Sequence, residues 1–310
     1  MNATTKFAGF AIGLAAVFGV AIGVGKLVGP VDDTKPAGHG DHTAAKTTDL
    51  PGGLLSTDRG YSIAIAQPDV PASAQSTVAF RILDANGKPV TAYTPNHEKD
   101  LHLIVVRRDM VGFQHVHPVL DQATGTWSAP LNLSRSGDYR VFADFVPAGG
   151  TGLTLGADLR VSGVYDVQPL PPPVPTAKVG DYTVTLNGNV APGIGSPVTL
   201  NVSRNGAPVT DLQPYLGAYG HLVALRASDL AYLHVHPEGS PADGKTPAGP
   251  KVKFIVNAPS PGDYRLFLDF KHGDVVRTAE FTVSVPATGA TSPVPAPASE
   301  GGHGDHGGGH

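Results

Sequence analysis

An internal repeat constrains this 310-residue chain more than any other feature. Residues 86–118 align without a gap with residues 205–237 at an offset of 119 positions, and 13 of the 33 aligned residues are identical. Both segments end in the tetrapeptide His-Val-His-Pro. A second matching pair, GDYRVFADF at 137–145 and GDYRLFLDF at 262–270, follows a loop that is six residues longer in the second copy. Self-similarity of this length indicates two copies of one structural unit.

Each copy has the pattern of short strands separated by turns. Apolar and polar residues alternate in segments such as 61–65, which favours half-buried strands, and Asn86-Gly87 is a hairpin-type turn. Outside residues 7–25 no segment has a helical period. About seven strands in roughly 105 residues per copy predict an antiparallel β-sandwich of immunoglobulin or cupredoxin type. The Gly-Asp-Tyr that opens a late strand, at 137–139 and 262–264, resembles the tyrosine placement of such sandwiches.

An apolar segment near the N-terminus indicates where the protein resides. Residues 7–25 are nineteen uncharged, mostly apolar residues between Lys6 and Lys26, long enough to cross a bilayer core of ~30 Å as a helix. We expect an uncleaved signal-anchor, with a cleaved signal peptide and a secreted protein as the alternative. Lys6 before this segment and Asp32-Asp33 after it indicate that the rest of the chain lies outside the cytoplasm.

The fold class expected is therefore all-β, with two tandem antiparallel sandwiches behind an N-terminal transmembrane helix. Segments rich in Gly, Pro and Ser, which cannot build a core, separate the folded parts. The expected divisions are a cytoplasmic stub with the transmembrane signal-anchor (1–30), a disordered stalk (31–57), the first sandwich (58–163), a Pro-rich linker (164–176), the second sandwich (177–285) and a disordered Gly/His-rich tail (286–310).

The composition excludes several classes of function. Because the chain has no cysteine, it has no disulfide, no thiolate nucleophile and no thiolate metal site. The formal net charge is −4 and the lysines and arginines are scattered, so no surface for nucleic acid is expected. No residues form an independent acid, base and nucleophile set. We therefore expect a protein that is not an enzyme.

Three histidines recur at equivalent positions in the two copies. Residues i and i+2 of a strand point to the same face, so His115 and His117 present adjacent imidazoles, and His102 lies on the preceding strand. With a nearby aspartate, such a set suits Zn(II), Cu(II) or Ni(II). His97 and His272 are not repeated, and we expect them to be ordinary surface residues. The repeated candidates are His102, His115, His117 and Asp144 in the first copy and His221, His234, His236 and Asp269 in the second.

A structural interpretation of the same residues remains open. The HxHP segments could be polar strand edges whose imidazoles bond backbone groups, and Asp144 could pair with Arg140 or Arg107. The segments outside the copies hold five more histidines, spaced by glycine, which is typical of weak, adaptable metal collection, although a solvated tail is the alternative. These five are His39, His42, His303, His306 and His310.

The combined pattern of HLxVxR, HxHP and GDYRxFxDF resembles that of bacterial membrane-anchored or secreted proteins described as heavy-metal-binding. The resemblance covers both copies and implies that the repeated histidines and aspartates bind metal. A looser similarity links the chain to extracytoplasmic copper carriers with cupredoxin-like sandwiches. The chain departs from carriers that hold Cu(I) through methionines, because Met1 and Met110 are its only methionines. This difference favours Cu(II) or Zn(II).

We therefore expect an extracytoplasmic, membrane-anchored protein that captures, buffers or delivers copper or zinc. Its expected partners are metal ions, the membrane through the N-terminal helix, and an envelope metal transporter or another envelope protein, but no nucleic acid. The alternative is a tandem β-sandwich module without metal that binds a cell-envelope protein or polysaccharide. Stoichiometric metal in the purified protein would separate these two functions.

Overall fold

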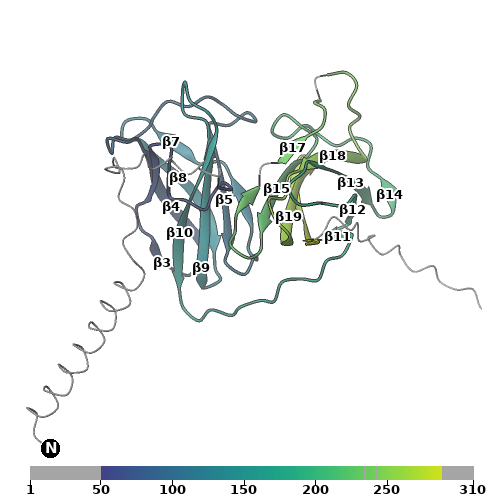
Figure 1. The fold of residues 1–310 in the computed structure, drawn as a ribbon, viewed down its shortest axis with the longest axis horizontal. Helices are drawn as coiled ribbons and strands as arrows, with labels where there is room; N and C mark the ends of the chain where they lie inside the picture. Colours follow the sequence, from purple (N-terminus) through teal and green to yellow (C-terminus); the bar gives the residue numbers. More distant parts are fainter. Residues whose placement is uncertain (1–49, 234, 242, 288–310) are drawn as a thin grey trace, which may run out of the picture. The chain divides into compact units, whose positions relative to one another are not determined.

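The computed structural model describes residues 50–233, 235–241 and 243–287. These residues form twenty strands and no helix, so the described part of the chain is all-β, as expected (Figure 1). None of the described residues belongs to a helix that could cross a bilayer. The expected anchor, nearly all of the stalk and nearly all of the tail lie outside the described residues.

The first repeat is a sandwich of two sheets. One sheet follows the order β1-β2-β4-β8-β7 and the other the order β3-β10-β9-β5-β6. All pairs are antiparallel except β3 with β10. The strands are β1 (Thr57–Asp58), β2 (Tyr61–Ile65), β3 (Asp69–Pro71), β4 (Ser73–Leu83), β5 (Leu101–Arg107), β6 (Gln114–Val116), β7 (Val119–Asp121), β8 (Thr126–Leu133), β9 (Gly137–Phe145) and β10 (Leu153–Ser162).

The second repeat has the same two-sheet plan. Its sheets follow the orders β11-β12-β13-β18-β17, with β14 beside β13, and β16-β15-β19-β20. Among the described residues no sheet is shared between the repeats. The strands are β11 (Thr176–Val179), β12 (Tyr182–Asn187), β13 (Ser196–Arg204), β14 (Ala207–Pro208), β15 (His221–Arg226), β16 (Tyr232–Leu233), β17 (Val235–Pro237), β18 (Lys251–Val256), β19 (Gly262–His272) and β20 (Val275–Val285).

The strand order is that of the immunoglobulin fold. If β2, β4, β8 and β7 are lettered A, B, E and D, and β10, β9, β5 and β6 are lettered G, F, C and C′, the first repeat has the sheets A-B-E-D and G-F-C-C′. The tyrosine corner of such sandwiches is present in both repeats. The Tyr139 hydroxyl donates to the Arg135 carbonyl at 2.7 Å, and the Tyr264 hydroxyl donates to the Ser260 carbonyl at 2.7 Å.

Strand β5 is buried on both of its faces. Leu101, Leu103 and Val105 point into the core of the first sandwich, because alternate residues of a strand point to one face. The residues between them, which include Ile104 and Val106, are also buried. Something other than the first sandwich must therefore cover the outer face of this sheet.

That cover is the equivalent sheet of the second repeat. Side chains from β5 and β9 meet side chains from β15 and β19 in one apolar cluster, which we call the inter-repeat cluster. Phe113 stacks on Phe267 with ring centroids 3.9 Å apart, and Arg108 donates to the Ala227 and Ser228 carbonyls at 3.2 and 2.5 Å. The buried members of the cluster are Ile104, Val106, Met110, Phe142, Val223, Leu225, Leu230, Tyr232 and Phe267.

The segment before β1 is also fixed to the repeats. Arg140 donates to the carbonyls of Gly53 and Leu54 at 2.7 and 2.9 Å, and the Tyr232 amide donates to Gly52 at 2.9 Å. Gly53 has φ +74°, and a Cβ there would lie 2.3 Å from a ring carbon of Phe142. The stalk expected at 31–57 therefore differs at its C-terminal end, where the chain is hydrogen-bonded to both repeats.

Candidate metal centre

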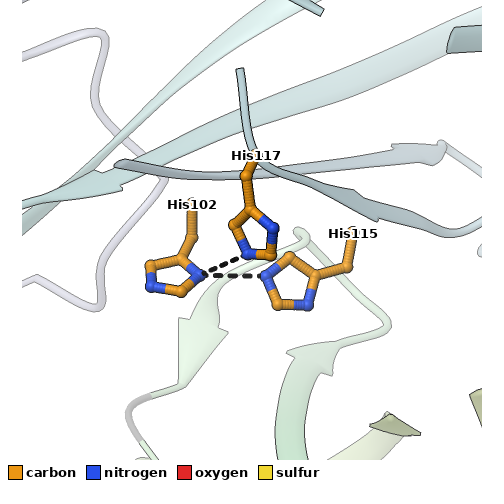
Figure 2. A group of neighbouring side chains, drawn as sticks. All are labelled: His102, His115 and His117. Atoms are coloured by element: carbon orange, nitrogen blue, oxygen red, sulfur yellow. Dashed lines mark hydrogen bonds between the residues drawn. The ribbon is translucent and has the colours of Figure 1, made fainter. Parts of the chain in front are cut away.

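Three imidazoles of the first repeat converge at the edge of the inter-repeat cluster. Nδ1 of His102 lies 3.1 Å from Nε2 of His115 and 3.2 Å from Nε2 of His117 (Figure 2). One nitrogen from each ring lies within 4.8 Å of the others, and His102 is buried while His115 and His117 are partly buried. The convergence predicted from the spacing of the first copy is therefore observed.

The register of two strands accounts for this convergence. Strand β6 pairs with β5 so that His115 lies opposite Ile104 and Val116 lies opposite Leu103. Continuing the same register would place His117 opposite His102. Cross-strand partners share a face, so all three imidazoles project from the outer face of the sheet, away from the core of their own sandwich.

Hydrogen bonds on the outer sides of two rings fix where their protons lie. Nε2 of His102 lies 2.9 Å from the Asn96 carbonyl, which can only accept, so this nitrogen carries the proton and Nδ1 has a lone pair. Nδ1 of His115 lies 2.7 Å from Oδ2 of Asp269, a carboxylate oxygen that accepts, so Nδ1 carries a proton and Nε2 is the nitrogen directed at His102. The Nδ1 lone pair of His102 faces that Nε2 at 3.1 Å.

Burial keeps His102 and His117 neutral near pH 7. Desolvation lowers the pKa of His102 to about 4, and neighbouring His115, His97 and Lys99 act in the same direction. Desolvation, with smaller contributions from His115 and His102, lowers the pKa of His117 to about 3. The lone pair on Nδ1 of His102 can accept a hydrogen bond from Nε2 of either neighbouring ring, or it can bind a cation together with these nitrogens.

The spacing fits a metal ion. Nitrogen–metal bonds of about 2.0–2.1 Å separate two ligand nitrogens by roughly 3.3 Å in a tetrahedral site. The observed separations of 3.1 and 3.2 Å are close to this value. Three imidazole nitrogens are a donor set that Zn(II) and Cu(II) accept.

Two further histidines adjoin these three rings. His221, on β15 of the second repeat, stacks on His102 with centroids 5.5 Å apart and lies 4.8 Å from His115. Desolvation lowers the pKa of His221 well below its ordinary value. The ring of His97 lies 5.6 Å from that of His221 and 6.2 Å from that of His102. The expectation that His97 is an ordinary surface residue is therefore wrong.

The alignment of the two copies concealed His97. Its counterpart is Leu216, and the two residues occupy the same turn, with φ of 47° and 56°. The two repeats share the backbone turn but not the side chain, so the repeat did not identify His97 as a candidate site residue. His272 also has a defined role, because its ring lies 2.7 Å from the Tyr182 hydroxyl and 3.1 Å from Asp211, outside the histidine cluster.

The structure separates the two candidate aspartates. Asp269 bonds the outer nitrogen of His115 and so lies behind a ring, not among the converging nitrogens. Asp144 is partly buried and accepts a hydrogen bond from the Thr154 hydroxyl at 2.9 Å, and desolvation raises its pKa to about 6. Among the described residues, neither belongs to the group of converging ligand atoms. The structural alternative, in which Asp144 pairs with Arg140 or Arg107, is not observed. Arg140 pairs with Asp158, and Arg107 pairs with Asp109.

The remaining candidates lie outside what the structure describes. His234 is one of them, and β17 includes the backbone of His236 but its side chain is not described. The convergence expected for His221, His234 and His236 therefore stays a prediction. The same holds for the histidines of the terminal segments, which are His39, His42, His303, His306 and His310.

Comparison with protein families gives one match, which occurs twice. The model of a domain of unknown function, DUF8832, matches residues 56–163 and 177–287, which together make up more than half of the chain. The chain belongs to this family. Each DUF8832 match contains one of the two sandwiches and one HxHP segment. A comparison with curated proteins gave no significant match.

Solved structures offer weaker similarities. The Escherichia coli adhesin FdeC is 16% identical, with a TM-score of 0.24 over 74% of this chain and 65% of that one. InvD of Yersinia pseudotuberculosis is 15% identical, with a TM-score of 0.25 over 77% and 62%. Invasin, a bacterial integrin-binding protein, is 16% identical, with a TM-score of 0.21 over 74% and 39%. The chain spans less than two thirds of each of these structures, and TM-scores this low carry no argument about function.

Proposed function

We propose that this protein is an extracytoplasmic, membrane-anchored metal-binding protein that captures, buffers or delivers Cu(II) or Zn(II). The observation that carries the proposal is the convergence of three imidazole nitrogens, in which Nδ1 of His102 lies 3.1 Å from Nε2 of His115 and 3.2 Å from Nε2 of His117. A cation bound there would form ligand bonds to His102 and His115. His117 would supply the third nitrogen.

The donor types support the choice of metal. Neutral imidazoles suit Zn(II) and Cu(II), whereas Cu(I) prefers thiolates and thioethers. The chain has no cysteine. Met110, the only methionine among the described residues, is 2% exposed and packs in the inter-repeat cluster, so its thioether contributes to packing.

The location and the wider set of ligands rest on the sequence. The apolar segment 7–25 would anchor the protein and leave the two sandwiches outside the cytoplasm. In the second repeat, His221 would act with the counterparts of His115 and His117, and the Gly-spaced histidines near the two ends would collect ions weakly. An envelope metal transporter or another envelope protein would exchange the ion, and no enzymatic reaction is part of the proposal.

The test is metal binding by the full chain purified without an affinity tag. We expect a strongly bound Cu(II) or Zn(II) ion in competition with a chelator of known affinity, beside weaker ions on the terminal segments. Changing His115 and His117 together to Asn should remove that strong ion, because it deletes two of the three converging nitrogens. For Cu(II), the electron paramagnetic resonance spectrum should show hyperfine splitting from imidazole nitrogens, and this splitting should be lost in the double variant.

A matched control uses the histidine that lies outside the cluster. His272→Asn removes one imidazole but none of the converging nitrogens, so the strong ion should remain. Absence of any strong ion in the unmodified chain, or its survival in the His115/His117 variant, would refute the proposal. The tandem sandwich would then be assigned to the alternative, a module that binds an envelope protein or polysaccharide without metal.

A further inference from the structure

One of the contacts at the candidate metal centre crosses between the repeats. His115 belongs to β6 of the first repeat, whereas Asp269, which accepts its Nδ1 proton at 2.7 Å, belongs to β19 of the second. The two side chains are 1% and 3% exposed. In the first repeat alone, the imidazole would keep its place on the strand but lose this partner.

Asp269 is itself held in a fixed orientation. The Thr278 hydroxyl donates to Oδ1 of Asp269 at 2.6 Å, which leaves Oδ2 for His115. Thr278 lies opposite Asp269 in the pairing of β19 with β20, and His221 lies opposite it in the pairing with β15. The carboxylate is therefore fixed at the centre of a sheet and directed at the first repeat.

This arrangement decides which nitrogen of His115 can bind an ion. A carboxylate that accepts the Nδ1 proton holds the ring in the tautomer whose Nε2 lone pair faces His102 and His117. It also makes that lone pair more basic. Without the carboxylate, the proton could move to Nε2, where it would block the ligand position.

The equivalent aspartate of the first repeat does not perform this role for the described rings. Asp144 occupies the same position of its strand as Asp269, and it has the same kind of partner, the Thr154 hydroxyl at 2.9 Å. It belongs to the same repeat as His115, yet His115 pairs with the aspartate of the other repeat. The three ligand nitrogens come from one repeat and the orienting carboxylate comes from the other.

We propose that Asp269 is the positioning residue of the metal centre, so that the ion is held at full affinity only while the two repeats are packed together. This inference rests on the proposed function. Metal binding would then stabilise the inter-repeat contact, because a ligand that prefers the packed state shifts the equilibrium toward it. The centre would be completed by folding of the whole tandem, not by one sandwich.

The experiment measures Cu(II) affinity of the full chain and of two variants, Asp269→Asn and Asp269→Leu, by competition with a chelator. Losing an orienting carboxylate of this kind weakens metal binding by roughly 10–100-fold, and we expect a loss in that range for Asp269→Asn. Asp269→Leu should lose more, because nothing then accepts the His115 proton. If the Leu variant does not fold, the Asn variant carries the test.

A second measurement separates positioning from simple support of the fold. Nitrogen-15 spectra of the metal-free chain should show His115 protonated on Nδ1, and this tautomer should be lost or mixed in Asp269→Leu. Two controls should keep both the tautomer and the affinity of the strong ion. Asp144→Asn removes the corresponding carboxylate, and Arg108→Ala removes a polar contact between the repeats without touching His115.

The outcomes are distinct. Lower affinity together with a changed His115 tautomer supports the inference. Unchanged affinity in both Asp269 variants, in a chain whose unmodified form binds the ion, overturns the inference and leaves the proposed function intact. A lower melting temperature with the tautomer and the affinity unchanged also overturns it, because Asp269 would then only support packing. If the unmodified chain binds no strong ion, the proposed function fails and this inference fails with it.

Discussion

The imidazole of His102 is buried at the edge of the inter-repeat cluster. It is 2% exposed, and its Nδ1 lies 3.1 Å from Nε2 of His115. The surrounding strands hold the rings in this position, so under the proposed function the ligand nitrogens are arranged before an ion binds. Such preorganisation would raise the affinity, because little ordering remains to be done on binding.

The burial of His102 predicts how stability depends on pH. Its pKa is lowered to about 4 in the folded protein, against about 6.5 in an unfolded chain. Between these values the unfolded state binds a proton that the folded state does not. The free energy of unfolding of the metal-free protein should therefore be highest above pH 6.5 and fall as the pH decreases toward 4, by on the order of 2–3 kcal/mol for this residue. Urea titrations across this range measure the change.

The control for this prediction is His102→Phe. An apolar ring removes the titrating group, so the variant should lose stability less steeply between pH 6.5 and 4 than the unmodified chain. His117 acts in the same direction, since burial lowers its pKa to about 3, and it should leave a residual slope. An identical slope in both proteins would show that His102 does not titrate as its burial requires.

Sequence patterns predicted the three converging histidines of the first repeat but not the residues that surround them. The i, i+2 spacing of His115 and His117 and the preceding strand of His102 are local features, and local register determines their convergence. The positions of His221, His97 and Asp269 depend on how the two repeats pack, which leaves no periodic trace in either copy. Packing between two similar faces could not be deduced from the alignment of those faces.

In one turn, the structural correspondence between the two repeats differs by one residue from the gapless sequence alignment. It pairs Met110 with Asp229 at the offset of 119, whereas the structure matches Met110 with Leu230, since both have positive φ and both pack in the inter-repeat cluster. The ion pairs agree, because Arg107 bonds Asp109 and Arg226 bonds Asp229. The second turn is one residue longer, and identities on either side conceal this difference.

Strands that are central in the sandwich were easier to predict than those at its edges. The long runs of β5 and β9 alternate or stay apolar over many residues, whereas β6 and β7 have three residues each. The HxHP segment shows why the edge strands of the sandwich are difficult to predict from sequence. In the first repeat its beginning pairs with β5, whereas in the second its end pairs with β18, which belongs to the other sheet.

The tyrosine corner gives a prediction at the level of the element. Replacing Tyr139 by Phe removes a buried hydrogen bond to the Arg135 carbonyl and leaves the ring in place. The free energy of unfolding should fall by about 1 kcal/mol, measured by urea denaturation. Tyr264→Phe is the matched change in the second repeat, where the hydroxyl donates to Ser260, and its loss should be similar. A loss near zero in both would show that the corner contributes no stability here.

A second prediction concerns the segment that precedes β1. Gly53 has φ +74° and lies against Phe142, so Gly53→Ala should combine backbone strain with a clash at 2.3 Å. We expect a loss of about 2–4 kcal/mol, measured as a lower melting temperature. Gly87→Ala is the control, because Gly87 has φ +75° but nothing within 4 Å. Equal losses would show that the contact with Phe142 adds nothing beyond strain.

In the whole molecule, equivalent residues of the two repeats meet each other. Ile104 corresponds to Val223, Val106 to Leu225 and Phe142 to Phe267, and all six pack in the inter-repeat cluster. The contact is therefore isologous in character, since the same surface of each half is used. The repeat predicted two similar sandwiches, but it did not predict an apolar outer face on each of them. The sequence of β5 has the pattern of a buried strand, and this pattern does not reveal which element covers the strand.

A charge placed in this contact should separate the repeats. Val223→Asp puts an unpaired carboxylate at a position that is 0% exposed, and the outer faces should part so that it can be solvated. We expect a larger radius of gyration in small-angle scattering, with the strand content unchanged in circular dichroism. Val276→Asp, at a position that is 40% exposed, is the control and should leave the radius unchanged. A fully unfolded Val223→Asp protein would contradict the independence of the two cores.

The strand-free segment 163–175 joins the two repeats, so the contact between their outer faces does not depend on protein concentration. Two separate sandwiches meeting through such faces would come apart on dilution, whereas a short connection keeps each half at an effective concentration in the millimolar range near the other. Joining the halves in one chain also lets them differ, so that Asn96 supplies a carbonyl to His102 in one repeat while Tyr215 stands at the equivalent position of the other.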